Sequence, residues 1–232
     1  MKHPGNTLRA VILDLDGTLI DTADDFIPVV QTLRAEQALA ALPAESIRNS
    51  VSSGARALVT LALDLQEGDS EFQQRLDRLL DLYAGILGTH SRLFPGVQAL
   101  LDALHSAGIP WGIATNKPSR FTLPLLDTLA VNPMPASVIC ADQVSRGKPD
   151  PECLLRNCED LQCSPSQAIY IGDHARDIEA GRRAGMFTIA ATYGYIEAGD
   201  NAAPWGADAS AVDGRELTAL IFNNAAQPAA SA

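Results

Sequence analysis

Carboxylates gather directly after a short apolar segment near the N-terminus. The sequence VILDLDGTLIDT at 11–22 predicts a buried strand that ends at Asp14, with Asp16 and Asp21 close behind. Carboxylates taken out of water lose hydration energy, and neighbouring carboxylates repel one another unless a cation or a shared proton relieves them. Turn capping is the alternative, but two acids that flank a leucine at a buried strand end are costly in that role. We therefore expect a cation here that the chain itself does not supply.

Lysines are rare in the chain, and their positions are informative. The 17 Lys and Arg residues include only three lysines, and two of these, Lys117 and Lys148, follow predicted core strands. Lysines with a purely solvated role are usually spread over helix surfaces. The pattern therefore favours a functional role for Lys148 in SRGKPDP, whereas a role for Lys117 stays open. Thr115 and Asn116 precede Lys117, but Thr115 alone is equally explained as the end of a strand.

A second acidic pair occurs in GDHARD at 172–177. Asp173 ends a predicted strand, and Asp177 follows four residues later in a predicted helix. Alone, the pair is explained as a helix N-terminus, where the helix dipole favours carboxylates. His174 is expected to be a solvent-facing loop residue rather than a ligand. The pair gains functional weight only from the polar residues at the other strand ends.

Alternating strands and helices are predicted to position these groups. Apolar strands are expected at 111–115, 137–141, 168–173 and 186–192, separated by amphipathic helices such as the one at 96–108. This alternation predicts an α/β fold with a doubly wound, mainly parallel, Rossmann-like sheet that comprises residues 1–20 and 91–232. Ligands of such sheets bind outside the carboxyl ends of the strands, so the four polar strand ends should meet at one place.

Residues 21–90 have a different pattern, with helical periodicity and no strand. One apolar stripe contains Phe26, Val29, Val30 and Leu33, and a second contains Phe72, Leu76, Leu79, Leu80, Tyr83 and Leu87. Because this segment interrupts the alternation directly after the first strand, we expect a helical cap domain inserted over the end of that strand.

Composition limits the partners of the protein. The 232 residues carry a formal net charge of −11, which argues against nucleic acid or an anionic membrane as a partner because both require clustered Lys and Arg. No apolar run has the length of a membrane span, and the first ten residues lack the apolar stretch of a secretory signal. The expectation is a cytoplasmic protein, and an anionic small substrate remains possible where cations are concentrated locally.

The polar strand ends occur in the order found in a known family. DLDGTL at 14–19, Thr115 with Asn116, Lys148 before PDP, and GDHARD at 172–177 resemble the four ordered motifs of the haloacid dehalogenase superfamily. This resemblance implies that Asp14 attacks phosphorus to form an aspartyl-phosphate and that Asp16 acts as general acid and base.

The same resemblance implies a metal and a phosphate site. Mg²⁺ would bind the Asp14 side chain, the Asp16 main-chain carbonyl and Asp173, with Asp177 next to these ligands. Thr115, the Asn116 amide and Lys148 would neutralise the transferring phosphoryl group. Gly17 would permit the sharp turn after the strand, and Thr18 would help to hold that loop.

The cap contains one further candidate, in SSGARALV at 52–59. Gly54 and Arg56 stand at the start of a predicted helix, where amides and a guanidinium favour anions. We hypothesise that Arg56 contacts the end of the substrate that carries no phosphate. A surface arginine at an ordinary helix start explains the pattern equally well.

The resemblance implies a Mg²⁺-dependent phosphatase for a small phosphorylated metabolite, similar to the phosphoglycolate phosphatase group. The stretches at 192–208 and 115–121 also resemble bacterial N-acetylmuramic acid 6-phosphate phosphatases, so the substrate stays open. A mutase resembling β-phosphoglucomutase remains possible, and a phospho-accepting receiver domain is the non-enzyme alternative, against which the DxDGT order and the helical insertion argue. Asp16 argues against a dehalogenase, and the absence of lysine from 21–90 argues against a phosphonatase.

Overall fold

A computed structural model of the chain describes residues 1–196 and 202–222. Residues 197–201, within the 192–208 stretch singled out above, lie outside the described residues, as do residues 223–232 at the end of the predicted core. None of the described helices is both long enough and apolar enough to pass through a membrane.

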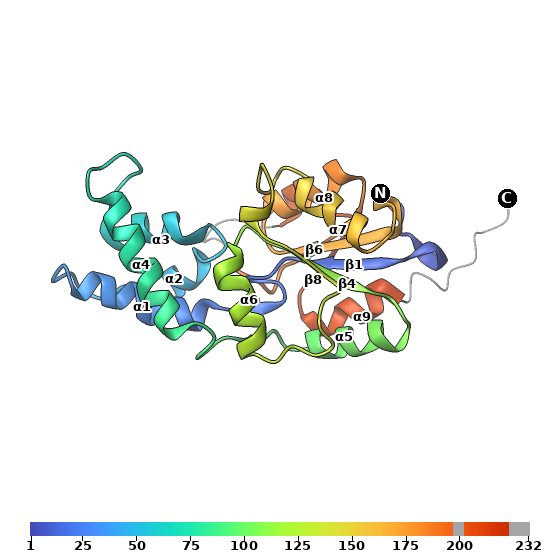
Figure 1. Cartoon of the computed structure of the whole chain (residues 1–232), viewed down its shortest axis with the longest axis horizontal. Helices are drawn as coiled ribbons and strands as arrows, with labels where there is room; N and C mark the ends of the chain where they lie inside the picture. The colour runs from blue at the N-terminus through green and yellow to red at the C-terminus, as the bar shows by residue number, and fades with distance from the viewer. Residues whose placement is uncertain (197–201, 223–232) are drawn as a thin grey trace.

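A six-stranded parallel sheet forms the centre of the larger part of the molecule (Figure 1). Its strands are β1 (Ala10–Leu13), β4 (Trp111–Ala114), β5 (Ser137–Ile139), β6 (Ala168–Gly172), β7 (Phe187–Ala191) and β8 (Ala209–Ala211). Their order is β5-β4-β1-β6-β7-β8, and every pair is parallel. Because the chain winds in both directions from β1, the predicted doubly wound, Rossmann-like sheet is confirmed.

Helices cover both faces of this sheet. In Figure 1, α7 (Glu152–Asp160) and α8 (Ala175–Ala184) lie above it, and α5 (Val97–Ser106) and α9 (Gly214–Phe222) lie below it. Successive residues of a strand point to opposite faces. Val11 and Leu13 accordingly join one apolar cluster of buried side chains, and Ala10 and Ile12 join a second cluster that α7 and α8 complete. The sheet is therefore largely apolar on both faces.

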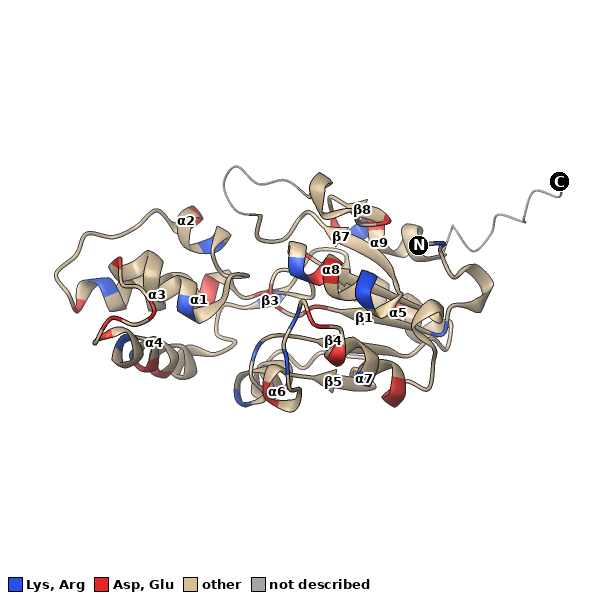
Figure 2. Cartoon of the chain, turned by 90° about the horizontal axis from the view of Figure 1, so that it is seen from above, with Lys and Arg blue, Asp and Glu red and all other residues tan. Residues whose placement is uncertain are grey.

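The helical segment stands at the carboxyl end of β1. It consists of α1 (Ala23–Ala35), α2 (Ala44–Asn49), α3 (Gly54–Leu63) and α4 (Phe72–Ile86). Figure 2 shows these helices as a group of their own beyond the end of the sheet. The first predicted stripe is buried throughout. In the second, Leu80 is only partly buried and Leu87 lies one residue beyond α4. The division of the chain into two domains at 20/21 and 90/91 stays a prediction.

Two short strands connect the helical segment with the sheet. The antiparallel pair β2 (Ile20–Asp21) and β3 (Arg92–Leu93) carries the chain out and back. Next to it, the buried Asp25 carboxylate accepts hydrogen bonds from the backbone N–H groups of Gly88 at 2.8 Å and His90 at 2.7 Å. The outgoing and returning chains are thereby fixed to each other.

Elements beyond the predicted ones are short. Single 3₁₀ turns occur at η1 (Gly5–Thr7), η2 (Ala141–Gln143), η3 (Pro165–Gln167) and η4 (Ala203–Trp205). Turn η2 and helix α6 (Ser119–Thr128) follow β5 and β4 respectively, and α6 stands between the sheet and the helical segment in Figure 1. The loops that follow β4 and β5 therefore lie at the carboxyl ends of the central strands.

Candidate active site

Asp14 lies directly after β1, where its backbone still takes part in the hydrogen bonding of the sheet. Its backbone N–H donates to the Ile171 carbonyl oxygen at 2.8 Å, so β6 fixes the main chain. Its Oδ1 accepts the Leu15 N–H at 2.7 Å and lies 2.7 Å from the Lys148 Nζ. Burial raises the pKa of Asp14 to about 6, although Lys148 opposes this shift. No hydrogen bond or ion pair from the described residues engages Oδ2, so one oxygen stays available.

Lys148 is the central cation of this group. Its Nζ lies 2.7 Å from Asp14 Oδ1 and 2.7 Å from Asp177 Oδ1, and it donates to the Ala114 carbonyl and the Tyr170 hydroxyl, both at 3.0 Å. Burial disfavours the ammonium form, but the two carboxylates outweigh this effect and raise the pKa of Lys148. Lys148 is therefore a permanent positive charge that is held in one place.

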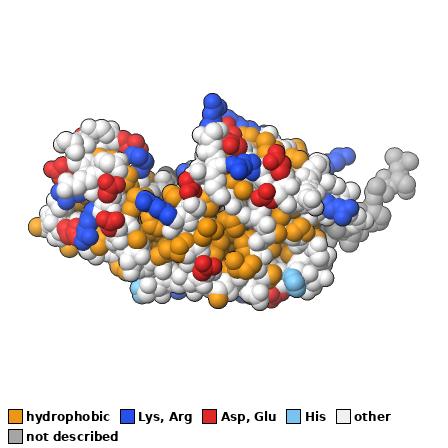
Figure 3. Space-filling model, viewed as in Figure 1, with side chains coloured by type: hydrophobic (Ala, Val, Ile, Leu, Met, Phe, Trp, Pro, Cys, Tyr) orange, Lys and Arg blue, Asp and Glu red, His pale blue; other side chains and the backbone are white. Residues whose placement is uncertain are grey.

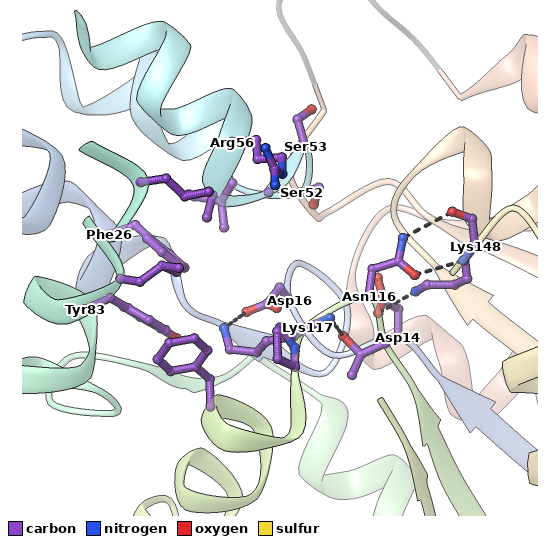
Figure 4. A pocket seen from close by; sticks show the side chains of 18 of the residues that line it. Asp14, Asp16, Phe26, Ser52, Ser53, Arg56, Tyr83, Asn116, Lys117 and Lys148 are labelled. Atoms are coloured by element: carbon purple, nitrogen blue, oxygen red, sulfur yellow. Dashed lines mark hydrogen bonds and ion pairs between the residues drawn. The ribbon is translucent and has the colours of Figure 1, made fainter. Parts of the chain in front are cut away.

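Asn116 positions the backbone of that lysine. Its side-chain amide donates to the Lys148 carbonyl at 3.1 Å, and its Oδ1 accepts the Lys148 N–H at 2.9 Å. Both of these contacts are visible in Figure 4. The contact of Asn116 with phosphate stays a prediction. Sequence reasoning missed the two hydrogen bonds by which Asn116 positions Lys148.

Three carboxylates converge beside Lys148. Oxygen atoms of Asp14, Asp173 and Asp177 lie within 4.8 Å of one another, and all three residues are buried. Burial raises the pKa of Asp173 to about 8, and the charges of Asp14 and Asp177 add to the shift. Since one ammonium faces three acids, the group lacks positive charge. Hard oxygen donors with excess negative charge fit a divalent cation such as Mg²⁺.

Neighbouring loops fix the Asp173 carboxylate. Its Oδ1 accepts the Thr18 hydroxyl at 3.0 Å, and its Oδ2 accepts the Ser52 hydroxyl at 2.7 Å and the Tyr195 N–H at 3.0 Å. Gly17 has φ +85°, and a Cβ there would lie 2.0 Å from Asp173 Oδ2. The turn after β1 therefore requires glycine for its backbone conformation and for its close approach to this acid.

The loop after β6 closes the acidic group. The Asp177 Oδ2 accepts the His174 N–H at 3.0 Å, and the His174 Nδ1 accepts the Arg176 N–H at 3.2 Å. Together these bonds cap the start of α8. His174 was expected to be a solvent-facing loop residue, but it is the partly buried cap of this helix.

Asp16 and Thr115 complete the core side of the site. The Asp16 Oδ1 accepts the Thr22 hydroxyl at 2.6 Å and the Lys117 ammonium at 2.9 Å. The Thr115 hydroxyl accepts the Lys117 N–H at 3.0 Å, which leaves its own proton for an anion. Burial disfavours a charged Lys117, but Asp16 outweighs this effect and the pKa of Lys117 is raised. The signals for Lys117 in the sequence were the rarity of lysine and its position after a predicted core strand.

A cavity of about 360 Å³ joins these groups to the helical segment. Asp14, Asp16, Thr115, Asn116 and Lys148 line its core side, whereas Asp173 and Asp177 are not among its lining residues. Figure 4 shows the core groups opposite side chains from the helical segment. That opposite wall is largely apolar and contains Phe26, Val51, Leu76, Leu80 and Tyr83. A notch between the helical segment and the larger part is also visible in Figure 3.

Arg56 lies at the margin of the cavity. Its guanidinium Nη1 is 3.1 Å from Glu67 Oε2, and its side chain is 54% exposed. Its predicted contact with the substrate therefore stays a prediction. Sequence reasoning missed Arg120 and Arg176, which also line the cavity. Neither makes a salt bridge within the described part of the chain.

Comparison with known proteins defines the class. Residues 11–191 match the sequence model of the haloacid dehalogenase-like hydrolases, and the chain belongs to this family. It is a phosphatase of this family, that is, a phosphoric monoester hydrolase. A solved structure of a predicted phosphoglycolate phosphatase from Haemophilus somnus has a TM-score of 0.82 at 23% identity, and covers 93% of this chain and 98% of its own. That likeness concerns the fold alone.

Curated relatives are more similar in sequence. The chain is 44% identical over 214 residues to the N-acetylmuramic acid 6-phosphate phosphatase of Pseudomonas aeruginosa, an alignment that covers 92% of this chain and 95% of the relative. It is 36% identical over 200 residues to the phosphoglycolate phosphatase of Xanthomonas campestris, covering 86% and 90% respectively. The two names describe substrates of very different size.

Proposed function

We propose that the protein hydrolyses a sugar-sized phosphate monoester that carries a carboxylate, with N-acetylmuramic acid 6-phosphate as the first candidate. The observation that carries this proposal is the cavity of about 360 Å³, in which the groups expected to bind phosphate face a largely apolar wall. Pockets for drug-sized ligands typically measure about 300–1,000 Å³. The 44% identity with the Pseudomonas aeruginosa phosphatase supports the same choice.

The reaction has two steps on Asp14. In the first, an Asp14 carboxylate oxygen attacks phosphorus and the ester P–O bond breaks, while Asp16 gives its proton to the leaving alkoxide. In the second, Asp16 takes a proton from water, which attacks the aspartyl-phosphate. The bond between phosphorus and Asp14 breaks, and inorganic phosphate leaves. The position of Asp14 and Asp16 on one cavity wall supports these roles.

Fixed charges around Asp14 assist both steps. Lys148 and the Thr115 hydroxyl would bind the phosphoryl oxygens, together with Asn116 as the resemblance implies. Mg²⁺, held by the Asp14 side chain, the Asp16 carbonyl and Asp173 with Asp177 beside them, would neutralise the negative charge of the phosphoryl group. Phosphate monoester hydrolysis can require acceleration up to ~10²¹-fold, whereas one acid–base group supplies about 10²–10⁴. Several groups must therefore act together.

The cavity also fits a second anionic group. Arg56, Arg120 and Arg176 are among the residues that line the same cavity as the apolar wall. Guanidinium groups bind carboxylates through paired hydrogen bonds. The lactyl carboxylate of N-acetylmuramic acid would have cationic partners here, and its sugar ring and acetyl methyl group would have the apolar wall.

2-Phosphoglycolate is the second candidate. It carries a carboxylate as well, and the 36% identity with the Xanthomonas campestris phosphatase favours it. However, a two-carbon acid would leave much of the cavity filled with water and would make few contacts with Leu76, Leu80 and Tyr83. Apolar surface that stays wet contributes nothing to binding.

Phosphate release from a matched set of substrates tests the proposal. We expect the kcat/KM for N-acetylmuramic acid 6-phosphate to exceed that for 2-phosphoglycolate at least tenfold. N-acetylglucosamine 6-phosphate, which lacks the lactyl carboxylate, should be hydrolysed less efficiently than the muramic acid ester. A preference for 2-phosphoglycolate would overturn the substrate choice. Isomerisation of a hexose phosphate without phosphate release would indicate a mutase instead.

A further inference from the structure

Lys117 occupies an unusual position between the core and the helical segment. It lies in the loop between β4 and α6, its side chain is 7% exposed, and it lines the cavity. Its partners come from both sides. We propose that Lys117 is a positioning residue that orients Asp16 for proton transfer, and that two aromatic rings of the helical segment hold Lys117 in place. The proposal rests on the proposed function in one respect, the role of Asp16 as the acid.

The contact with Asp16 uses only one carboxylate oxygen. The Lys117 Nζ and the Thr22 hydroxyl both donate to Oδ1, at 2.9 Å and 2.6 Å. Among the described residues, no hydrogen bond or ion pair engages Oδ2 of Asp16. Because both donors hold the same oxygen, the rotation of the carboxylate is fixed and the second oxygen is left free. A free and oriented oxygen is what a proton donor to the leaving group requires.

The opposite side of the ammonium meets aromatic rings. The Lys117 Nζ lies 4.6 Å from the ring centroid of Tyr83 and 5.3 Å from that of Phe26. The two rings are stacked, with their centroids 4.1 Å apart and their planes at 11°. Distances below about 6 Å are in the range of cation–π interaction, and because the rings are stacked on each other the ammonium lies beside the stack, over the face of one ring at most. Figure 4 shows Lys117 between Asp16 and this aromatic pair.

The two rings belong to the inserted helices rather than to the sheet. Phe26 lies in α1 and Tyr83 in α4, whereas Asp16 and Lys117 follow the sheet strands β1 and β4. Without the two rings, the Lys117 ammonium would still pair with the Asp16 carboxylate, but the lysine side chain would be free to adopt other rotamers. Proton transfer by Asp16 would therefore depend on the helical segment lying over the core, which is also the arrangement that encloses a substrate.

Direct phosphate binding by Lys117 is the competing explanation. A lysine that binds the phosphoryl group should assist every phosphate ester to a similar degree. A lysine that orients a general acid should matter most when the leaving group is a poor one, because good leaving groups need little protonation. The dependence of the rate on the leaving group therefore separates the two roles.

The first experiment compares Lys117→Met with Lys117→Arg and Asp16→Asn. For an alkyl phosphate such as the sugar ester, we expect Lys117→Met to lower kcat by about 10²-fold with KM changed less than about threefold. With p-nitrophenyl phosphate, the pre-steady-state burst of p-nitrophenol should stay within a few-fold of the wild-type rate, as in Asp16→Asn. Lys117→Arg keeps the charge and should recover part of the lost activity.

Two outcomes would overturn the proposal. An equal loss of the burst rate and of alkyl phosphate turnover would show direct phosphate binding, and unchanged kinetics would show no role. If Asp16→Asn itself showed no dependence on the leaving group, the role of Asp16 in the proposed function would be wrong. If Asp16→Asn showed this dependence and Lys117→Met did not, the inference about Lys117 alone would fail.

A second experiment tests the aromatic partners with a matched pair. Tyr83→Leu should reproduce the leaving-group pattern of Lys117→Met with a smaller loss, and Tyr83→Phe, which keeps the ring, should lose less than Tyr83→Leu. Combining Tyr83→Leu with Lys117→Met should cost less than the product of the two single losses. Circular dichroism melting confirms that each variant is folded. An increase in KM alone in Tyr83→Leu, or fully multiplicative losses, would overturn the role of the rings.

Discussion

The two walls of the cavity are built on opposite principles. The core wall concentrates buried charge, and its buried charged groups have several fixed partners, as Lys148 has two carboxylates, a carbonyl and a hydroxyl. The wall from α1–α4 consists mostly of apolar and aromatic side chains with few polar atoms. The difference agrees with the proposed function, in which the core wall carries out the reaction and the opposite wall contacts the rest of the substrate.

Polar and aromatic contacts join the two walls directly. The Ser52 hydroxyl, from the loop before α3, donates to Asp173 of the acidic group at 2.7 Å, and Lys117 contacts Tyr83 of α4. Each contact joins a group with a role in the proposed reaction to the helical segment. The two walls therefore differ in composition, but these contacts fix their positions relative to each other.

The largest effect is expected at the nucleophile on the core wall. Asp14→Asn should lower kcat by more than about 10⁴-fold, because the amide cannot form the aspartyl-phosphate. The fold should survive, since the change removes one of three buried carboxylates and leaves Asp177 to pair with Lys148. Phosphate release and trapping of acid-stable phosphoprotein measure the outcome. Retained activity would mean that another residue is the nucleophile.

Removal of divalent ions is expected to affect the same wall almost as strongly. Dialysis against a chelator should abolish phosphate release, and Mg²⁺ should restore it. Because a ligand that binds only the folded state stabilises by about 2.7 kcal/mol at 100 times its Kd, Mg²⁺ should also raise the melting temperature. Asp173→Asn should reduce that rise. Full activity after thorough chelation would contradict the metal site.

Lys148 tests how much the buried charges depend on one another. Lys148→Met leaves Asp14 and Asp177 without their ammonium, and removing one partner of a buried pair typically costs about 3–5 kcal/mol. We expect a loss of that size in urea unfolding, together with loss of activity. Mg²⁺ should recover part of the stability but not the activity. A variant as stable as the wild type would show that these carboxylates are not ionised together.

The smallest effect is expected on the opposite wall. Arg56→Ala should raise KM for the sugar ester by about tenfold, which corresponds to about 1.4 kcal/mol, and should leave kcat unchanged. Glu67→Ala is the matched control, because it removes the partner of Arg56 without removing the guanidinium. An equally small change in both variants would identify Arg56 as an ordinary surface residue.

The sequence predicted the core wall much better than the opposite wall. Core strands were recognisable because each is a short apolar run, and the polar residues after β1, β4 and β6 meet because parallel strands share one carboxyl edge. In contrast, β8 has the sequence ASA, which lacks the β-branched and aromatic residues that indicate a strand. It forms because β7 offers an edge with which to pair.

Contacts between distant segments could not be predicted in this way. Ser52 reaches Asp173, and Lys117 lies against Phe26 and Tyr83, only because the helical segment packs against the carboxyl end of the sheet. Periodicity shows that Phe26 and Tyr83 belong to apolar stripes, but it does not show which cation they face. The rarity of lysine pointed to Lys117, and only the three-dimensional contacts suggest what it does.

The bonds of Asp25 with the returning chain bear on how such enzymes diversify. Because this carboxylate fastens the exit of the insertion to its entry, residues between the two points form a cassette whose ends are already closed. A graft that kept Asp25 and its two amide donors could exchange most of the intervening helices, provided that it also kept the contacts of Ser52 with Asp173 and of the aromatic pair with Lys117. Substrate preference could thus evolve through changes in the inserted helices.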